Sequence, residues 1–258
     1  MPGVSHDDAG PDAALARHEL GTAPRKGPLL GVLGTLVVSN VMANQVLPSW
    51  AYVPWNCGVA VVLVVIATRA DGASADDLGL APRRVPDGLR WGGAVSAGLL
   101  AIYLIGLAIP ETRGLFEDER ADVGALDMLW RTLVLIPFGT VLMEEVAFRG
   151  VLPAMFRRRL GDSGTAALRA DVFAALLFGL WHVLPSLDLN EANPVFRDLL
   201  PGPVDQALTV AGGVLATGVA GMGLSWLRNR SGSLVAPAML HCSTNSLGYV
   251  LAWFVQRG

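Results

Sequence analysis

The sequence predicts an all-α fold, a polytopic bundle of about seven transmembrane helices with the N-terminus in the cytoplasm. Its 258 residues are 52% hydrophobic and 16% charged, whereas soluble domains average about 45–50% apolar and about 25% charged residues. The mean hydropathy is +0.48, and the charges cluster between long uncharged runs. With a net charge of −3 and no continuous basic surface, the chain is not expected to bind nucleic acid.

Seven apolar segments approach the roughly 20 residues that a helix needs to cross a bilayer. They are Leu29–Leu47, Tyr52–Thr68, Leu89–Ile109, Leu126–Met143, Ala170–Leu187, Ala207–Leu227 and Ser233–Phe254. The first two give the weakest membrane signal, because the first carries Asn40, Asn44 and Gln45 and the second is short. Residues 29–258 are predicted to form one transmembrane domain.

The N-terminal residues 1–28 form a separate zone. They contain three aspartates and four prolines and have no sustained apolar period, which predicts a disordered cytoplasmic tail. The first apolar run begins too far from the start and is too long for a signal peptide, so no cleavage is expected.

The segment Val146–Leu160 is semi-apolar and ends in three consecutive arginines. It is predicted to form an amphipathic or re-entrant helix, interrupted near Pro153. Most of the 19 lysines and arginines, Arg149 included, fall in segments that share one side of the membrane if the N-terminus is inside. The positive-inside rule therefore places the N-terminus in the cytoplasm and the C-terminus outside.

Two adjacent glutamates, Glu144 and Glu145, follow the fourth apolar segment. Carboxylates at membrane depth are costly and are functional hypotheses by default. Successive helical residues point about 100° apart, so the two side chains are expected to have different roles. Glu145 and Arg149 are spaced i,i+4 and are expected to pair, which leaves Glu144 to face another direction. The competing interpretation is a surface helix end with a salt bridge.

Two apolar segments each carry one histidine, His182 and His241. Counted along helices, Glu144, His182 and His241 all lie about 16–20 Å from the basic flank of their segments. Asn245 lies one turn after His241, so the two side chains point the same way. Each could instead be a satisfied structural polar group. The agreement in depth favours a common site.

Two chemistries fit these residues. In the first, Glu144, His182 and His241 bind Zn²⁺ and leave an open position for water. In the second, Glu144 is the general base for water and His182 assists, while His241 and Asn245 stabilise the oxyanion. The sequence has no HExxH, no GxSxG and no paired intramembrane aspartates, which disfavours rhomboid-type and presenilin-type proteolysis.

Three ordered motifs resemble those of the CAAX protease and bacteriocin-processing (CPBP, or Abi) family, which is related to the Rce-type prenyl-CAAX endopeptidase. They are Glu144-Glu145-x-x-x-Arg149, Phe178-x-x-x-His182 and His241-x-x-x-Asn245. The resemblance covers about residues 126–255, and Asp-Asp-Leu-Gly-Leu at 76–80 is also similar to the family. No motif departs from the family pattern.

The resemblance implies an intramembrane endopeptidase, a hydrolase of metallo- or glutamate type, whose active site opens to the cytoplasm. It would act on a membrane-associated peptide or protein, from within the bilayer of a bacterial inner (plasma) membrane. Glu144 would activate water with His182, His241 and Asn245 would bind the oxyanion, and Glu145 with Arg149 would order the site. The alternatives are a non-catalytic scaffold or immunity protein of the same fold, or a transporter that relays protons or metal ions through Glu144 and the histidines.

Overall fold

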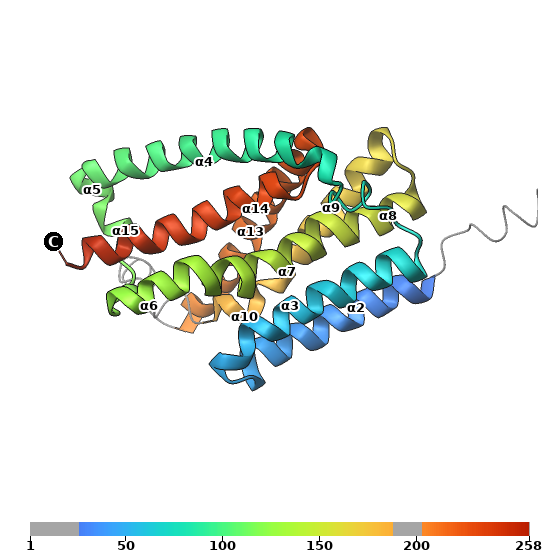
Figure 1. Cartoon of the computed structure of the whole chain (residues 1–258). Coiled ribbons are helices and arrows are strands. Elements are labelled where there is room, and N and C mark those ends of the chain that lie inside the picture. Colours follow the sequence, from blue (N-terminus) through green and yellow to red (C-terminus); the bar gives the residue numbers. More distant parts are fainter. Residues whose placement is uncertain (1–25, 188–202, 258) are drawn as a thin grey trace, which may run out of the picture.

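The protein is an all-α membrane bundle of long helices that run up and down between two ends (Figure 1). The computed structural model describes residues 26–187 and 203–257. The described elements are α2 Lys26–Val41, η1 Met42–Val46, α3 Ser49–Val65, η2 Ile66–Ala70, η3 Pro82–Arg84, α4 Val85–Ala108, α5 Pro110–Arg113, η4 Gly114–Phe116, η5 Glu119–Ala121, α6 Ala125–Trp130, η6 Arg131–Val141, α7 Leu142–Glu145, η7 Val146–Val151, α8 Leu152–Leu160, α9 Gly164–Trp181, α10 Val183–Ser186, α13 Pro203–Ser231, α14 Val235–Cys242, η8 Ser243–Leu247 and α15 Gly248–Val255.

Six helices among the described residues are long and apolar enough to cross a membrane: 26–46, 49–70, 82–108, 125–160, 164–181 and 206–231. They correspond in order to the first six predicted segments. The seventh, Ser233–Phe254, is helical from Val235 to Val255 but is not among these six. Its polar run from His241 to Ser246 lowers its hydropathy. The predicted tail lies outside the described residues up to residue 25, and its last three residues open α2.

The helix from Ala125 to Leu160 differs most from its prediction. It is continuous over 36 residues, so the interruption expected near Pro153 is wrong. A π-helical segment, η7, ends two residues before this proline, which stands in the first turn of α8. Proline is tolerated in a first turn, where its missing N–H is not needed. The glutamates therefore lie inside a helix rather than at its end.

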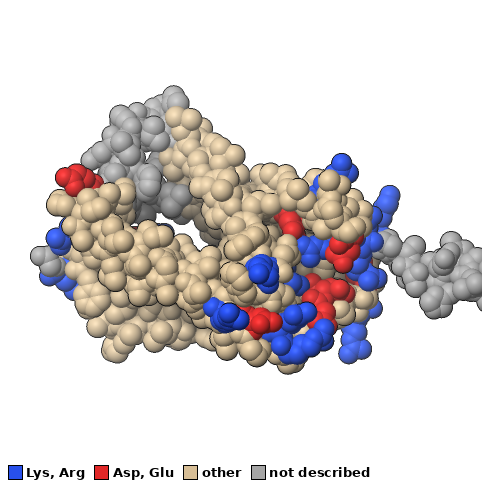
Figure 2. All heavy atoms as spheres, turned by 90° about the horizontal axis from the view of Figure 1, so that it is seen from above, with Lys and Arg blue, Asp and Glu red and all other residues tan. Residues whose placement is uncertain are grey.

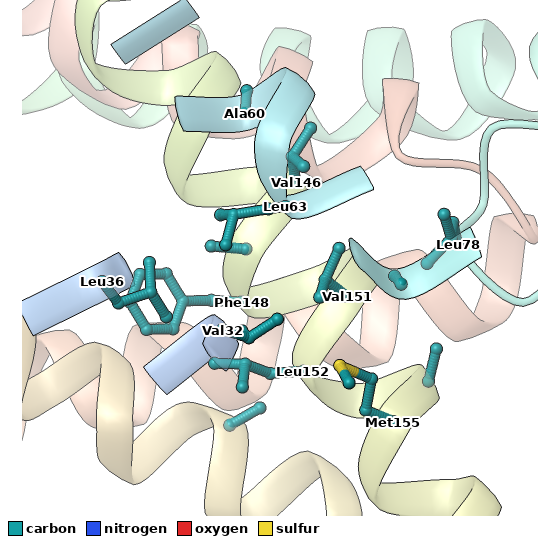
Figure 3. Close-up of a cluster of buried hydrophobic side chains, with 14 of the residues drawn as sticks. Val32, Leu36, Ala60, Leu63, Leu78, Val146, Phe148, Val151, Leu152 and Met155 are labelled. Atoms are coloured by element: carbon teal, nitrogen blue, oxygen red, sulfur yellow. The ribbon is translucent and has the colours of Figure 1, made fainter. Parts of the chain in front are cut away.

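The apolar core lies where α2, α3, η7 and α8 meet (Figure 3). Phe148, Leu63, Leu152 and Met155 are all 2% exposed or less. Leu78 joins the cluster from the loop between η2 and α4. Because lipid supplies little hydrophobic drive between helices, close packing of such side chains holds them together.

Charged side chains on the face shown in Figure 2 gather mainly at one end of the bundle. The carboxylate of Asp71 forms ion pairs with Arg158 and Arg159, at 3.5 and 2.5 Å. Asp171 pairs with Arg157 at 2.6 Å. These contacts tie the loop after η2 and the first half of α9 to the end of α8.

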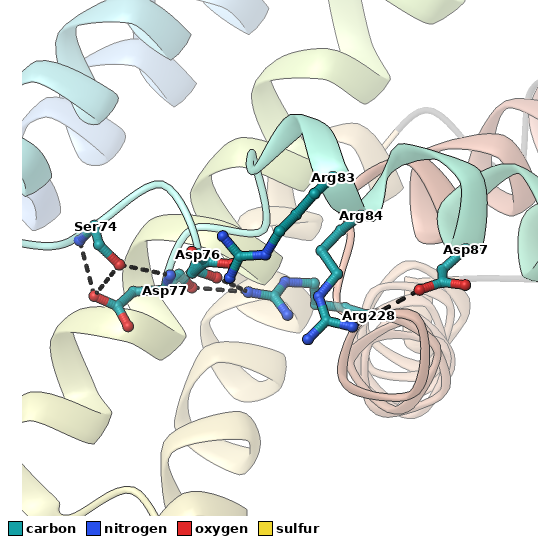
Figure 4. A network of polar contacts seen from close by, with 7 residues as sticks. All are labelled: Ser74, Asp76, Asp77, Arg83, Arg84, Asp87 and Arg228. Carbon is teal, nitrogen blue, oxygen red and sulfur yellow. Dashed lines mark hydrogen bonds and ion pairs between the residues drawn. The ribbon is translucent and has the colours of Figure 1, made fainter.

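The loop 71–81 at that end is fixed by Arg228 of α13 (Figure 4). Its Nη2 donates to the carbonyl oxygens of Asp76 and Asp77, at 3.0 and 2.8 Å. Gly79 has φ +71°, and a Cβ there would overlap the Nε of Arg228. Glycine is the residue that this conformation and this approach allow. The carbonyl oxygen of Gly79 in turn accepts a hydrogen bond from the Leu234 N–H at 2.9 Å, which fixes the start of α14.

Candidate active site

Glu144 and Glu145 come from α7, a short α-helical stretch between two π-helical segments, η6 and η7. Pro137 stands within η6 and has no N–H to donate. Wide i→i+5 turns of this kind occur often at functional sites. Both glutamates are buried, with 4% and 1% of their surface exposed, so their charges must be met by protein groups.

Arg149 meets the charge of Glu145. Its Nη1 lies 3.3 Å from Glu145 Oε1, so the predicted i,i+4 pair is confirmed. Its Cζ also lies 3.8 Å from the centre of the Phe178 ring, on α9, where a guanidinium is attracted to the aromatic face. Arg149 is only 1% exposed. Counting it among the cytoplasmic arginines is therefore wrong, because a glutamate and an aromatic ring accommodate its charge inside the bundle.

His241 of α14 stands between the two glutamates. Its Nδ1 lies 2.8 Å from Glu145 Oε1, which fits an N–H donated to the carboxylate, and its Nε2 lies 3.7 Å from Glu144 Oε2. Nε2 is thus the ring nitrogen that faces Glu144. One imidazole thus contacts both carboxylates from different sides, as their divergent directions predict.

Glu144 has a second partner, Trp181, at the end of α9. The indole Nε1–H donates to Glu144 Oε1 at 3.0 Å, in a buried setting. The other oxygen, Oε2, accepts no hydrogen bond from the described residues. Phe148 packs against Trp181 and Phe178 with ring centres 5.7 and 5.2 Å apart. The three rings thus pack together beside Glu144.

His182 follows Trp181 and is half-buried. Its Nδ1–H donates to the Phe178 carbonyl oxygen at 2.8 Å, which leaves Nε2 as the basic nitrogen of the neutral ring. Phe178 touches both imidazoles, with its ring centre 4.5 Å from that of His182 and 6.1 Å from that of His241. His182 thus joins the site through Phe178, while Trp181 makes the hydrogen bond from α9 to Glu144.

Asn245 lies one turn beyond His241, in the π-helical segment η8, and is half-buried. Across the part of the chain that the structure describes, no hydrogen bond joins its side chain to the glutamates. Its neighbour Ser246 donates to the Thr132 carbonyl at 2.9 Å. That bond ties η8 to the helix that carries the glutamates.

Residues 126–247 match the family model described as type II CAAX prenyl endopeptidase Rce1-like. These residues are similar to that family, and we refer to them as the Rce1-like core. The matched range contains all six predicted site residues and agrees with the resemblance that the three motifs predicted. Comparisons with curated proteins and with solved structures find no match. The Rce1-like core is therefore similar to a family of membrane endopeptidases.

The zinc hypothesis requires Glu144, His182 and His241 to converge. Within residues 26–187 and 203–257, no group of three or more His, Cys, Asp or Glu side chains could hold a metal ion. Both nitrogens of His241 already face carboxylates. The arrangement of the Rce1-like core therefore does not fit a three-ligand zinc site. Zinc binding by these residues therefore stays a prediction.

Sequence reasoning missed two polar residues of the Rce1-like site region, Trp181 and Asn40. Trp181 stands directly before His182, but an indole in an apolar segment looks like packing. Asn40 donates to the Trp181 carbonyl oxygen at 2.8 Å, although the two are 141 positions apart. A polar amide inside an apolar span is itself a signal of an internal contact.

Proposed function

We propose that the protein is an intramembrane endopeptidase that uses Glu144 to activate water for hydrolysis of a peptide bond. The observation that carries the proposal is a buried imidazole, His241, between two carboxylates within the Rce1-like segment. Such a set holds a general base and a proton carrier in contact, which acyl hydrolysis needs. The substrate class is a membrane-associated peptide or protein, and the proposed location is a bacterial plasma membrane.

In the proposed reaction, Glu144 takes a proton from water, and the water oxygen bonds to the carbonyl carbon of the scissile peptide. The carbonyl electrons move to oxygen and form an oxyanion. His241 and Asn245 stabilise that charge. The C–N bond then breaks, and the proton taken by Glu144 goes to the leaving amine, with His182 assisting.

Glu145 and Arg149 serve this reaction by holding His241. Glu145, 2.8 Å from Nδ1, fixes the plane of the imidazole ring. Nε2 is then the nitrogen that faces Glu144, and an N–H at that position would donate to the oxyanion.

The test is cleavage by the full-length protein reconstituted in liposomes. The probes are a farnesylated quenched peptide ending in a CAAX motif, its unprenylated form, and a single-span membrane protein. Glu144→Gln, His182→Ala and His241→Ala should each lower cleavage of the responsive probe by at least 100-fold, a typical contribution of one acid–base group. Glu111→Gln, an exposed glutamate in α5, is the matched control. Cleavage unchanged in Glu144→Gln, or absent for all three probes, would contradict the proposal.

The same assay distinguishes the two chemistries. We expect cleavage to continue in protein stripped with a strong chelator, and elemental analysis to find less than one metal ion per chain. Loss of cleavage on chelation, restored by one equivalent of zinc, would establish the metal mechanism instead.

A further inference from the structure

Glu144 must keep one orientation if it is to act as a base. Its Oε1 accepts the indole N–H of Trp181 at 3.0 Å, and its Oε2 faces His241 Nε2 at 3.7 Å. An indole can only donate a hydrogen bond, so the bond from Trp181 occupies Oε1 of Glu144. The other carboxylate oxygen, Oε2, is left for proton transfer. The position of the indole therefore decides where the basic oxygen points.

Trp181 is the last residue of α9. The last carbonyl groups of a helix lack partners within it and need donors from outside. His182 satisfies two of them, with its Nδ1 on Phe178 and its backbone N–H on Gly179. The Trp181 carbonyl takes the Asn40 side-chain amide at 2.8 Å. Asn40 of α2 thus caps the end of α9 and fixes the residue that binds Glu144.

Trp181 also borders an apolar groove. The groove, of about 340 Å³, lies between α2 and α9, and Trp181, Phe148 and Asn40 line it. Two contacts restrain Trp181 there. Phe148, at 5.7 Å between ring centres, restrains the ring, and Asn40 restrains its backbone.

We infer that Trp181 and Asn40 are positioning residues of the catalytic base: Trp181 aims Glu144 through its indole N–H, and Asn40 holds Trp181 by capping α9. The inference rests on the proposed function of Glu144. It gives a role to Asn40, one of the three polar residues that weakened the membrane signal of the first span. The chain of contacts runs from α2 through α9 to α7, so α2 takes part in catalysis without touching substrate.

The test compares Trp181→Phe, which keeps an aromatic ring but loses the N–H, with Trp55→Phe. Trp55 makes an equivalent indole bond, 3.1 Å to Ser39 of α2, that does not involve Glu144. A hydrogen bond to a charged group is worth about 10- to 100-fold in an equilibrium. We expect Trp181→Phe to lower kcat by about 10- to 100-fold with KM nearly unchanged, and Trp55→Phe to leave both unchanged.

Asn40→Ala should lower kcat about 3- to 10-fold, with Ser39→Ala as its control. Because Asn40 acts through Trp181, the double variant Asn40→Ala/Trp181→Phe should be no slower than Trp181→Phe alone. Additive losses would show that Asn40 acts by another route. Thermal unfolding in detergent identifies variants that simply fail to fold.

An infrared measurement tests the same contact without turnover. The carboxylate band that disappears in Glu144→Gln should shift in Trp181→Phe and not in Trp55→Phe. An unshifted band together with a normal kcat in Trp181→Phe overturns the inference, while Glu144→Gln would still be inactive. Activity in Glu144→Gln would instead overturn the proposed function.

Discussion

At the scale of single residues, Arg149 carries its charge where water does not reach it. It is 1% exposed and lies 3.3 Å from Glu145 and 3.8 Å from the Phe178 ring. Burying a charge costs several kcal/mol, which only a well-placed partner offsets. Glu145 is equally buried and depends on Arg149 and His241 in the same way. The pair is thus a condition for folding as well as for the site.

Arg149→Met should therefore destabilise the protein by about 3–5 kcal/mol, because it leaves Glu145 buried without its cation. Adding Glu145→Gln to Arg149→Met should recover most of that stability, since a neutral pair needs no compensation. Reversible unfolding in mixed micelles measures both. Equal stability of Arg149→Met and the unchanged protein would mean that water reaches the pair. The double variant should remain inactive if Glu145 orders His241.

At the scale of elements, close contact between α9 and α13 places the end of α9. A Cβ at Gly179 would lie 2.6 Å from the Val214 carbonyl oxygen, and one at Gly221 would lie 3.1 Å from the Phe178 ring. Small residues let backbones approach in membrane helices. Gly221 belongs to the small-residue stripe with Gly213 and Thr217 that the sequence shows at four-residue spacing. Packing of this kind fixes Phe178, and through it both imidazoles.

Gly179→Ala should force the two helices apart and destabilise the protein by about 1–3 kcal/mol, the usual cost of overpacking. It should also reduce cleavage, because Trp181 and His182 follow two and three residues later. Gly212→Ala on α13 is the control, since nothing lies within 4 Å of its added Cβ. The measurements are thermal unfolding in detergent and cleavage of the same probe. Equal unfolding temperatures for the two variants would contradict this account of the α9–α13 contact.

The sequence could predict α7 only in part. The i,i+4 spacing of Glu145 and Arg149 required nothing beyond helix geometry, and the pair forms. Continuity of the helix past Pro153 could not be read from the sequence, because proline in an apolar segment breaks some helices and only starts a new turn in others. In the structure the π-helical segment η7 precedes Pro153, and the helix continues past it.

At the scale of the whole molecule, the two ends of the bundle differ in charge (Figure 2). Arg157, Arg158 and Arg159 lie where α8 gives way to α9, at the end where α2 also begins (Figure 1). The C-terminus lies at the opposite end. Arginines and lysines concentrate on the cytoplasmic side of membrane proteins, so the arginine-rich end is predicted to face the cytoplasm.

Cysteine labelling measures this orientation. Asp162 lies at the arginine-rich end and Asp122 at the other end, and their side chains are 84% and 83% exposed. Each is replaced by cysteine in a separate variant, Asp162→Cys and Asp122→Cys. With Cys57 and Cys242 replaced by serine, an impermeant maleimide should label position 122 from outside intact spheroplasts and position 162 only after lysis. The reverse pattern would place the N-terminus outside.

The sequence by itself determined the fold class of the protein and most of its helices, and it proposed the residues of the site, because apolar length, helical period and rare intramembrane charges are local signals. It also determined that Glu144 and Glu145 face different ways. Only the tertiary structure decided their partners: His241 contacts both, and Trp181 rather than His182 is hydrogen-bonded to Glu144. Contacts between helices depend on rotation and depth, which small residues and helix ends fix in three dimensions. For that reason Asn40, more than a hundred residues away in the chain, had no visible link to the glutamate.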